Sequence, residues 1–75
     1  MNEDYRPILA MGSMGPEVEM LQRILFSIGY ETGPIDGIFG PLTRGAVVSF
    51  QLDNGLVPDG IVGPRTWKVI DLVYP

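Results

Sequence analysis

The chain has 75 residues, a formal net charge of −4, 45% hydrophobic residues, no histidine and no cysteine. A chain of this length forms one domain, and its core must rest on packing alone because no disulfide can support it. Histidine and cysteine are the commonest metal ligands, and histidine is the commonest general base. We therefore expect no metal, no cofactor and no catalytic residue.

The charge pattern also argues against two classes of partner. The five basic residues are scattered singly along the chain, which is unlike the basic stripes that bind nucleic acid or anionic membrane surfaces. No apolar run approaches the roughly 20 residues of a membrane-spanning helix. The first five residues, Met1 to Tyr5, are polar and acidic, so the sequence predicts no secretory signal peptide.

The first predicted element is an extended N-terminal arm, residues 1–11, which precedes a domain at 12–75. Ile8 and Leu9 are adjacent aliphatic residues in this arm. We expect both side chains to pack onto the helices, because a chain this small needs all the apolar burial it can obtain.

Three glycine-proline pairs mark the starts of predicted helices. Proline suits the first helical position because its missing N–H would be unbonded there, and glycine is an acceptable N-cap. Apolar residues at helical spacing predict helices at about 16–28, 41–53 and 64–73, with Gly29 and Gly55 as stops and Pro75 unable to extend the last. The expected apolar faces hold Val18, Leu21, Leu25 and Ile28; Thr43, Ala46, Val47 and Phe50; and Trp67, Val69, Ile70 and Val73.

The loops between these helices carry one phrase twice, Asp-Gly-Ile-x-Gly-Pro-x-Thr, at 36–43 and 59–66. Asp-Gly predicts a turn in which the carboxylate bonds the backbone ahead and glycine takes a positive φ. We expect Ile38 and Ile61 to return an apolar side chain to the core, and the threonine hydroxyls to reach back to the open helix start. The residues given structural turn or cap roles are Asp36, Gly37, Gly40, Asp59, Gly60, Gly63 and Thr66.

The repeat is wider than this phrase, because Val18 to Gln22 and Val47 to Gln51 also match. A helix, a loop and the next helix therefore occur twice and share the middle helix. This pattern predicts an all-α fold, a compact three-helix bundle with two long loops and an internal pseudo-repeat. The equivalent positions of Gln22 and Gln51 favour amides that bond the loop backbone over amides that face a ligand. Trp67 is expected in the core with a partner for its N–H.

Fragments spread along the chain occur in a characteristic order: Gly12-Ser-Met-Gly-Pro-Glu-Val, Leu21-Gln22, Gly29-Tyr30, Asp36-Gly-Ile-Phe-Gly, Phe50-Gln51, Asp59-Gly-Ile-Val-Gly and Thr66-Trp67. Over residues 12–74 the chain resembles the peptidoglycan-binding domain found at one end of many bacterial and phage cell-wall hydrolases. The resemblance implies a three-helix, non-catalytic module that holds a hydrolase or another wall protein on peptidoglycan. It also implies a catalytic domain in the parent chain or complex, and action in the cell wall, extracellular or periplasmic.

Peptidoglycan presents sugars and short peptides with carboxylates and amides, so recognition needs a shallow groove with an apolar floor and a few polar groups. We expect this groove at the first loop, because Phe39 stands where the second copy has Val62. Arg44 would pair there with a stem-peptide carboxylate, or else remain a solvated surface residue. The candidate groove residues are Tyr30, Ile38, Phe39, Leu42, Thr43 and Arg44.

An alternative function is a protein–protein adaptor of the same fold. Several apolar or small residues lie off the predicted core faces and would form a surface for a companion domain or for a second copy in a homodimer: Met20, Phe26, Gly45, Val48 and Leu52. The N-terminal arm could instead cover Val48 and Leu52.

A stand-alone enzyme is the third reading, and it would need a pair of carboxylates in a cleft. Asp36 and Asp59 are the only pair that the repeat suggests, and both have turn roles. The sequence therefore favours binding over catalysis.

Overall fold

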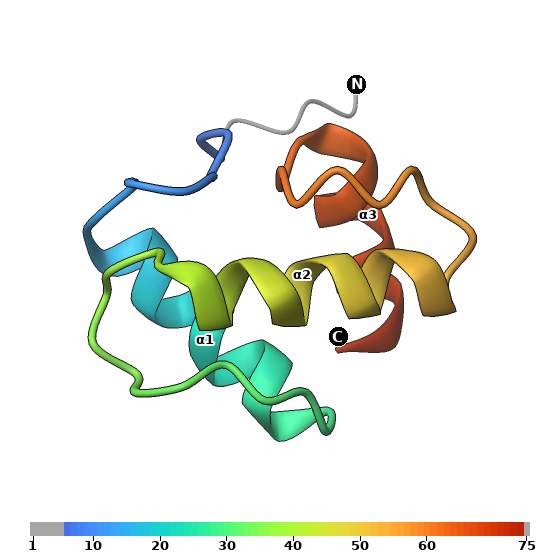
Figure 1. Ribbon diagram of the computed structural model, residues 1–75. Helices are drawn as coiled ribbons and strands as arrows, with labels where there is room; N and C mark the ends of the chain where they lie inside the picture. Colours follow the sequence, from blue (N-terminus) through green and yellow to red (C-terminus); the bar gives the residue numbers. More distant parts are fainter. Residues whose placement is uncertain (1–5, 75) are drawn as a thin grey trace.

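The computed structural model describes residues 6–74, so the expectations for Met1 to Tyr5 and for Pro75 lie outside the described residues. It contains three α-helices, α1 (Pro16–Ser27), α2 (Pro41–Asp53) and α3 (Pro64–Val73). Figure 1 shows α2 running across the middle of the molecule. Between residues 6 and 74 there are two isolated β-bridges and no strand, and no helix there is both long and apolar enough to span a membrane. The predicted all-α three-helix fold is confirmed.

The helix ends follow the glycine and proline punctuation of the sequence. α2 and α3 have the predicted bounds, whereas α1 ends at Ser27. Beyond α1, Gly29 takes a φ of 102°, and the next N–H, that of Tyr30, donates to the Leu25 carbonyl at 2.8 Å. Gly55 ends α2 with a φ of 70°. Both helices thus stop where a left-handed residue turns the chain and satisfies the last carbonyls.

The core draws on all three helices, both loops and the arm. The expected faces of α1 and α2 are buried except for Ile28, which is half-buried, and on α3 Val73 is exposed. Trp67 is buried as predicted. The buried apolar residues are Leu9, Val18, Leu21, Ile24, Leu25, Phe39, Ala46, Val47, Phe50, Val62, Trp67 and Ile70.

Inside the repeated phrase, the structure reverses the expected directions of two neighbouring side chains. Ile38 and Ile61 are 52% and 43% exposed, while Phe39 and Val62 after them are 1% and 0% exposed. Consecutive side chains in an extended segment point to opposite sides, so only one of each pair can enter the core. Backbone pairing with the arm accompanies this register, because the N–H groups of Leu9 and Val62 donate to each other's carbonyl at 3.1 and 2.8 Å. The prediction that the isoleucines turn inward is wrong.

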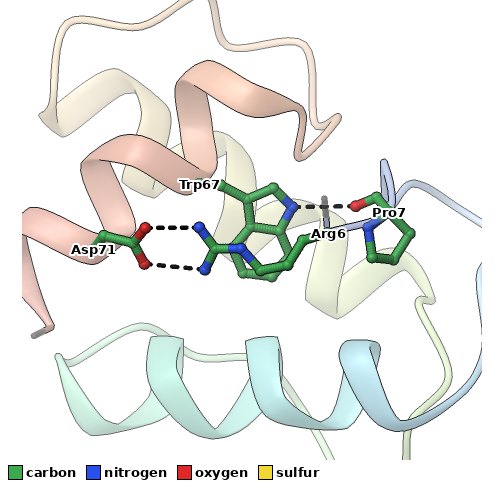
Figure 2. Close-up of polar contacts among 4 residues, drawn as sticks. All are labelled: Arg6, Pro7, Trp67 and Asp71. Atoms are coloured by element: carbon green, nitrogen blue, oxygen red, sulfur yellow. Dashed lines mark hydrogen bonds and ion pairs between the residues drawn. The ribbon is translucent and has the colours of Figure 1, made fainter. Parts of the chain in front are cut away.

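The N-terminal arm is fastened to α3 by polar contacts (Figure 2). Trp67 Nε1 donates to the Pro7 carbonyl at 3.1 Å, which confirms the predicted partner for this N–H. The Arg6 guanidinium lies 4.3 Å from the centre of the Trp67 ring and donates to both carboxylate oxygens of Asp71, at 3.0 and 2.6 Å. Ile8 is exposed, so its predicted packing is wrong. The arm is therefore held by Arg6 and Pro7 at α3 and by Leu9 at the second loop.

Gly45 is expected to be a point of easy stabilisation. It lies exposed inside α2, its φ is not positive, and an added Cβ would meet no atom within 4 Å. Replacing it by alanine reduces the freedom of the unfolded chain, so Gly45→Ala should raise the free energy of unfolding by about 0.5–1 kcal/mol in urea denaturation.

The matched control for that substitution is Gly37→Ala. Gly37 has a φ of 76°, and a Cβ there would lie 3.2 Å from the backbone oxygen of Gly15. This change should cost about 1–3 kcal/mol. A stabilising Gly37→Ala, or a destabilising Gly45→Ala, would contradict the described backbone.

Candidate functional site

The side-chain amide of Gln22 organises the first loop from below. Its Oε1 accepts from the N–H groups of Asp36 and Gly37 at 3.1 and 2.9 Å. Its Nε2 donates to the Ile38 carbonyl and to Thr43 Oγ1, each at 3.0 Å. Because Gln22 is buried, these bonds satisfy an amide that would otherwise be costly to bury.

Gln51 holds the second loop in the same way. Its Oε1 accepts from the Gly60 N–H at 2.9 Å, and its Nε2 donates to the Ile61 carbonyl at 2.9 Å and to Thr66 Oγ1 at 3.2 Å. The prediction that both glutamines bond the loop backbone is confirmed. The two loops are therefore copies in their hydrogen bonding as well as in sequence, and each glutamine is part of the scaffold.

The threonines of the repeated phrase belong to these networks, which corrects two expectations. Thr43 Oγ1 accepts from Gln22 and donates to the Thr32 carbonyl at 3.3 Å, so it does not reach back to the helix start. Thr66 accepts from Gln51 instead. Thr43 is also buried, and its hydroxyl already accepts one hydrogen bond and donates another, so it has no unused donor to offer a ligand.

Each aspartate of the phrase closes a turn on its own backbone. Asp36 Oδ1 accepts from the Ile38 N–H at 3.0 Å, and Asp59 Oδ1 accepts from the Ile61 N–H at 2.9 Å. The bond from the Ile38 N–H, helped by Gln22, lowers the pKa of Asp36 below its ordinary value of 3.8. Both carboxylates thus do structural work.

This lowered pKa predicts a contribution to stability that depends on pH. The folded protein favours the charged carboxylate, so the contribution is full above the ordinary pKa of 3.8 and is lost as the pH falls through the lower folded value. Asp36→Asn keeps an acceptor oxygen but cannot titrate. The stability difference between the wild type and this variant, measured by urea denaturation, should be constant above pH 5 or so and should shrink below about pH 4. A difference that grows on acidification would contradict this assignment.

Phe39, the residue chosen to locate a groove, is a core residue. Its side chain is buried within the hydrophobic cluster, so it has no surface to offer a ligand. The variation between Phe39 and Val62 is therefore a difference in core volume between the two copies. The expectation that Phe39 forms part of a groove is therefore wrong.

Tyr30 is half-buried and is tied to α2. Its ring packs edge-on against Phe50, with centroids 5.7 Å apart and planes at 80°. Its hydroxyl donates to Asp53 Oδ2 at 2.7 Å. That hydrogen bond is the main cause of the raised pKa of Tyr30. The tyrosine thus joins the end of the first loop to the end of α2.

The remaining groove candidates are exposed but diverge. Ile38 and Leu42 are exposed beside the first loop. Arg44 instead lies against the second loop, because a Cβ built on Gly60 would be 2.9 Å from Arg44 Nε. Of the six predicted groove residues, Phe39 and Thr43 are buried, Tyr30 is half-buried and Arg44 lies against the other loop. The six therefore do not form one surface.

A pocket of about 440 Å³ opens at the second loop, where no groove was predicted. Its volume falls in the range of small-molecule sites. Its lining combines apolar side chains with two buried polar residues, Gln51 and Thr66, and two residues of opposite charge, Asp59 and Arg65. Among residues 6–74 no cluster of acidic side chains could hold a metal ion. The lining consists of Gln51, Gly55, Leu56, Val57, Asp59, Ile61, Gly63, Pro64, Arg65 and Thr66.

The surface assigned to a protein partner is largely open. Phe26 and Leu52 are 60% and 61% exposed, Met20 and Gly45 are exposed, and Val48 is half-buried. The exposure of Leu52 shows that the described part of the arm does not cover it. The rest of the arm, Met1 to Tyr5, lies outside the described residues.

Comparison with known proteins assigns the family. A family model described as "Putative peptidoglycan binding domain" matches residues 14–70. The chain is 47% identical over 66 residues to an uncharacterised protein of Kitasatospora aureofaciens, covering 87% of this chain and 56% of that protein. It is 46% identical over 54 residues to the N-acetylmuramoyl-L-alanine amidase CwlM of Mycobacterium tuberculosis, covering 72% of this chain and 13% of the amidase.

Solved structures show the same fold. The endolysin of the Burkholderia phage AP3 superposes with a TM-score of 0.84 at 42% identity, over 92% of this chain and 26% of the endolysin. The SleB N-terminal domain superposes with a TM-score of 0.86 at 34% identity, over 89% of this chain and 92% of that chain. The chain therefore spans a small part of the amidase and of the endolysin, but nearly the whole of the SleB domain.

Proposed function

Since this chain belongs to the peptidoglycan-binding domain family, we propose that it is a non-catalytic module that binds peptidoglycan and anchors a wall-acting catalytic domain. The supporting observation is the family match over 14–70, which includes the pocket at the second loop. Relatives such as the amidase and the endolysin carry this unit within longer chains. Weak binding suffices for an anchor, because tethering raises the local concentration of the attached domain. The place of action proposed is the cell wall, outside the cell or in the periplasm.

Co-sedimentation with purified insoluble sacculi tests this function. The chain should pellet with sacculi and stay in solution with cellulose, another insoluble glycan. Val57 lines the pocket, whereas Leu72 lies on α3 outside it, and both side chains are largely exposed. Val57→Asp should therefore lower the bound fraction several-fold, because a charge in an apolar rim must be desolvated on binding.

Leu72→Asp is the matched control, since it adds the same charge at a similarly exposed site and should leave binding unchanged. Absence of binding at a large excess of sacculi would overturn the proposed function. Equal binding by both variants would show that the chain binds sacculi at a place other than this pocket.

The exposed apolar surface suggests a second candidate role as an adaptor. Phe26 and Leu52 are large apolar side chains that no described residue covers. We propose that this surface meets a companion domain or a second copy. Sedimentation velocity should then show association that rises with concentration and is lost in the double variant Val48→Asp with Leu52→Asp. A strict monomer up to millimolar concentration would exclude the homodimer.

A further inference from the structure

The two copies of the loop differ in the hydrogen bonding of their threonines. In the first copy, Thr43 Oγ1 accepts from Gln22 and donates to the Thr32 carbonyl. In the second copy, Thr66 Oγ1 accepts from Gln51 and donates to no acceptor among residues 6–74. Thr66 is only 5% exposed, yet it lines the pocket. A buried threonine whose hydroxyl has no described acceptor therefore lines an open space.

The reason for the difference is the length of the two loops. From Gly29, the left-handed residue after α1, to Asp36 is seven positions, whereas from Gly55, the left-handed residue after α2, to Asp59 is four. The first loop thus has three additional residues before its turn. The second loop has no residue that could play the part of Thr32.

The additional residues fill the space that the second copy leaves open. Thr32 is buried, and Gly33 lies so close to Leu42 that an added Cβ would be 2.8 Å from Leu42 Cδ1. The position of Leu42 in the second copy is taken by Arg65, and Arg65 and Thr66 both line the pocket. The first loop therefore places its own backbone where the second copy has a cavity.

We propose that this pocket binds a peptide carbonyl of the peptidoglycan stem peptide, with Thr66 as the hydrogen-bond donor. The bound peptide takes the place that Thr32 and Gly33 occupy in the first copy. Leu56, Val57 and Ile61 contact its short apolar side chains. The assignment rests on the proposed peptidoglycan binding and names the part of the polymer that is recognised.

Two properties of the lining favour the peptide over the glycan. Aromatic side chains provide the large flat apolar faces on which a sugar ring could pack, and none lines the pocket. Arg65 lines it with no partner among the described residues and can pair with a carboxylate, which the stem peptide carries. The occupant of the equivalent place in the first copy is itself peptide backbone.

The experiment separates the two halves of the polymer. Sacculi are digested with an amidase, and the released stem peptides and the glycan strands are purified separately. Each is titrated into the ¹⁵N-labelled 75-residue chain. The stem peptides should shift the amide signals of Gly60, Ile61, Arg65 and Thr66, and leave those of the equivalent first-loop residues unchanged. They should also displace the chain from intact sacculi.

Thr66→Val with Thr43→Val as its control tests the hydrogen bond. Both changes keep the side-chain shape and remove one acceptor from a glutamine. Thr43→Val also removes the donor to the Thr32 carbonyl, so the control carries the larger structural cost. Thr43 lies under the first loop and away from the pocket. Thr66→Val should weaken stem-peptide binding about 5- to 10-fold, the effect of one lost hydrogen bond, while Thr43→Val keeps the wild-type affinity.

Each result decides between the two levels of the proposal. Shifts confined to the second loop, together with the Thr66→Val loss, support the stem-peptide assignment. Displacement of the chain from sacculi by glycan strands but not by stem peptides overturns the assignment and leaves the proposed function standing. Equal affinity of Thr66→Val and Thr43→Val for sacculi has the same consequence. Failure of the wild type to bind sacculi overturns both. Should Thr66→Val fail to fold, Arg65→Gln replaces it and should weaken the same titration.

Discussion

Replacing Phe39 by alanine is expected to lower the free energy of unfolding by about 3–5 kcal/mol, the usual cost of removing a buried phenylalanine. Phe39 is among the largest fully buried side chains of the described chain. Small domains have total stabilities toward the lower end of about 5–15 kcal/mol. The variant should therefore be largely unfolded near body temperature, and urea denaturation followed by circular dichroism would measure the loss.

The neighbouring Ile38→Ala is the matched control, because Ile38 is half-exposed. We expect it to cost less than about 1 kcal/mol. The pair distinguishes the observed register from the one expected of the repeated phrase. If the isoleucine faced the core and the phenylalanine faced a ligand, the two costs would be exchanged, and Phe39→Ala would lose binding without losing stability.

Replacing Gln22 by leucine should be about as damaging, although the residue is polar. The change leaves the buried N–H of Gly37, the Ile38 carbonyl and the Thr43 hydroxyl without the partner that serves them all. Each unsatisfied buried group costs about 1–3 kcal/mol, so we expect a total loss of about 3–5 kcal/mol once the loop relaxes. Gln51→Leu should lower the free energy of unfolding by a similar amount, because Gln51 makes the equivalent hydrogen bonds to the second loop.

Arg23→Leu is the control for the glutamine substitution. Arg23 is exposed on the same helix and pairs with Glu19 at 2.6 Å. Exposed pairs of this kind contribute little, so the midpoint of urea denaturation should change by less than the equivalent of about 0.5–1 kcal/mol. A Gln22→Leu variant as stable as Arg23→Leu would show that the loop does not depend on the amide.

The helices could be predicted from the sequence because their signals are local. Pro41 and Pro64 begin their helices as expected, and Gly29 and Gly55 end theirs. Each signal depends on a conformation that one residue type adopts easily. α1 was predicted one residue too long, because Ile28 is the C-cap that precedes the left-handed glycine.

The direction of side chains in the loops could not be predicted in the same way. Whether Ile38 or Phe39 enters the core depends on pairing with the segment before α1, more than 20 residues earlier in the chain: the Phe39 N–H donates to the Ser13 carbonyl at 2.9 Å. Such contacts are set by the tertiary fold and leave no local pattern. The prediction that Phe39 lines a groove is wrong for this reason.

A signal for the pocket was nevertheless present in the sequence. The spacing from glycine to aspartate is three residues longer in the first loop than in the second. Comparing the lengths of the two copies, rather than their letters, would have indicated that one loop fills a space the other leaves open. The site of function would then be expected at the shorter loop, beside Thr66.

Both units share α2, so the fold resembles a solenoid, in which each repeat contacts only the neighbouring repeats. Adding a further repeat would require a glutamine in the last helix that holds the next loop by hydrogen bonds. In α2, Gln51 stands ten positions after Pro41, and ten positions after Pro64 stands Tyr74, the exposed C-cap of α3. α3 therefore has no glutamine at that place. A helix lengthened by one turn, with glutamine at that place and a third copy of the phrase, would be the starting point for a designed extended array.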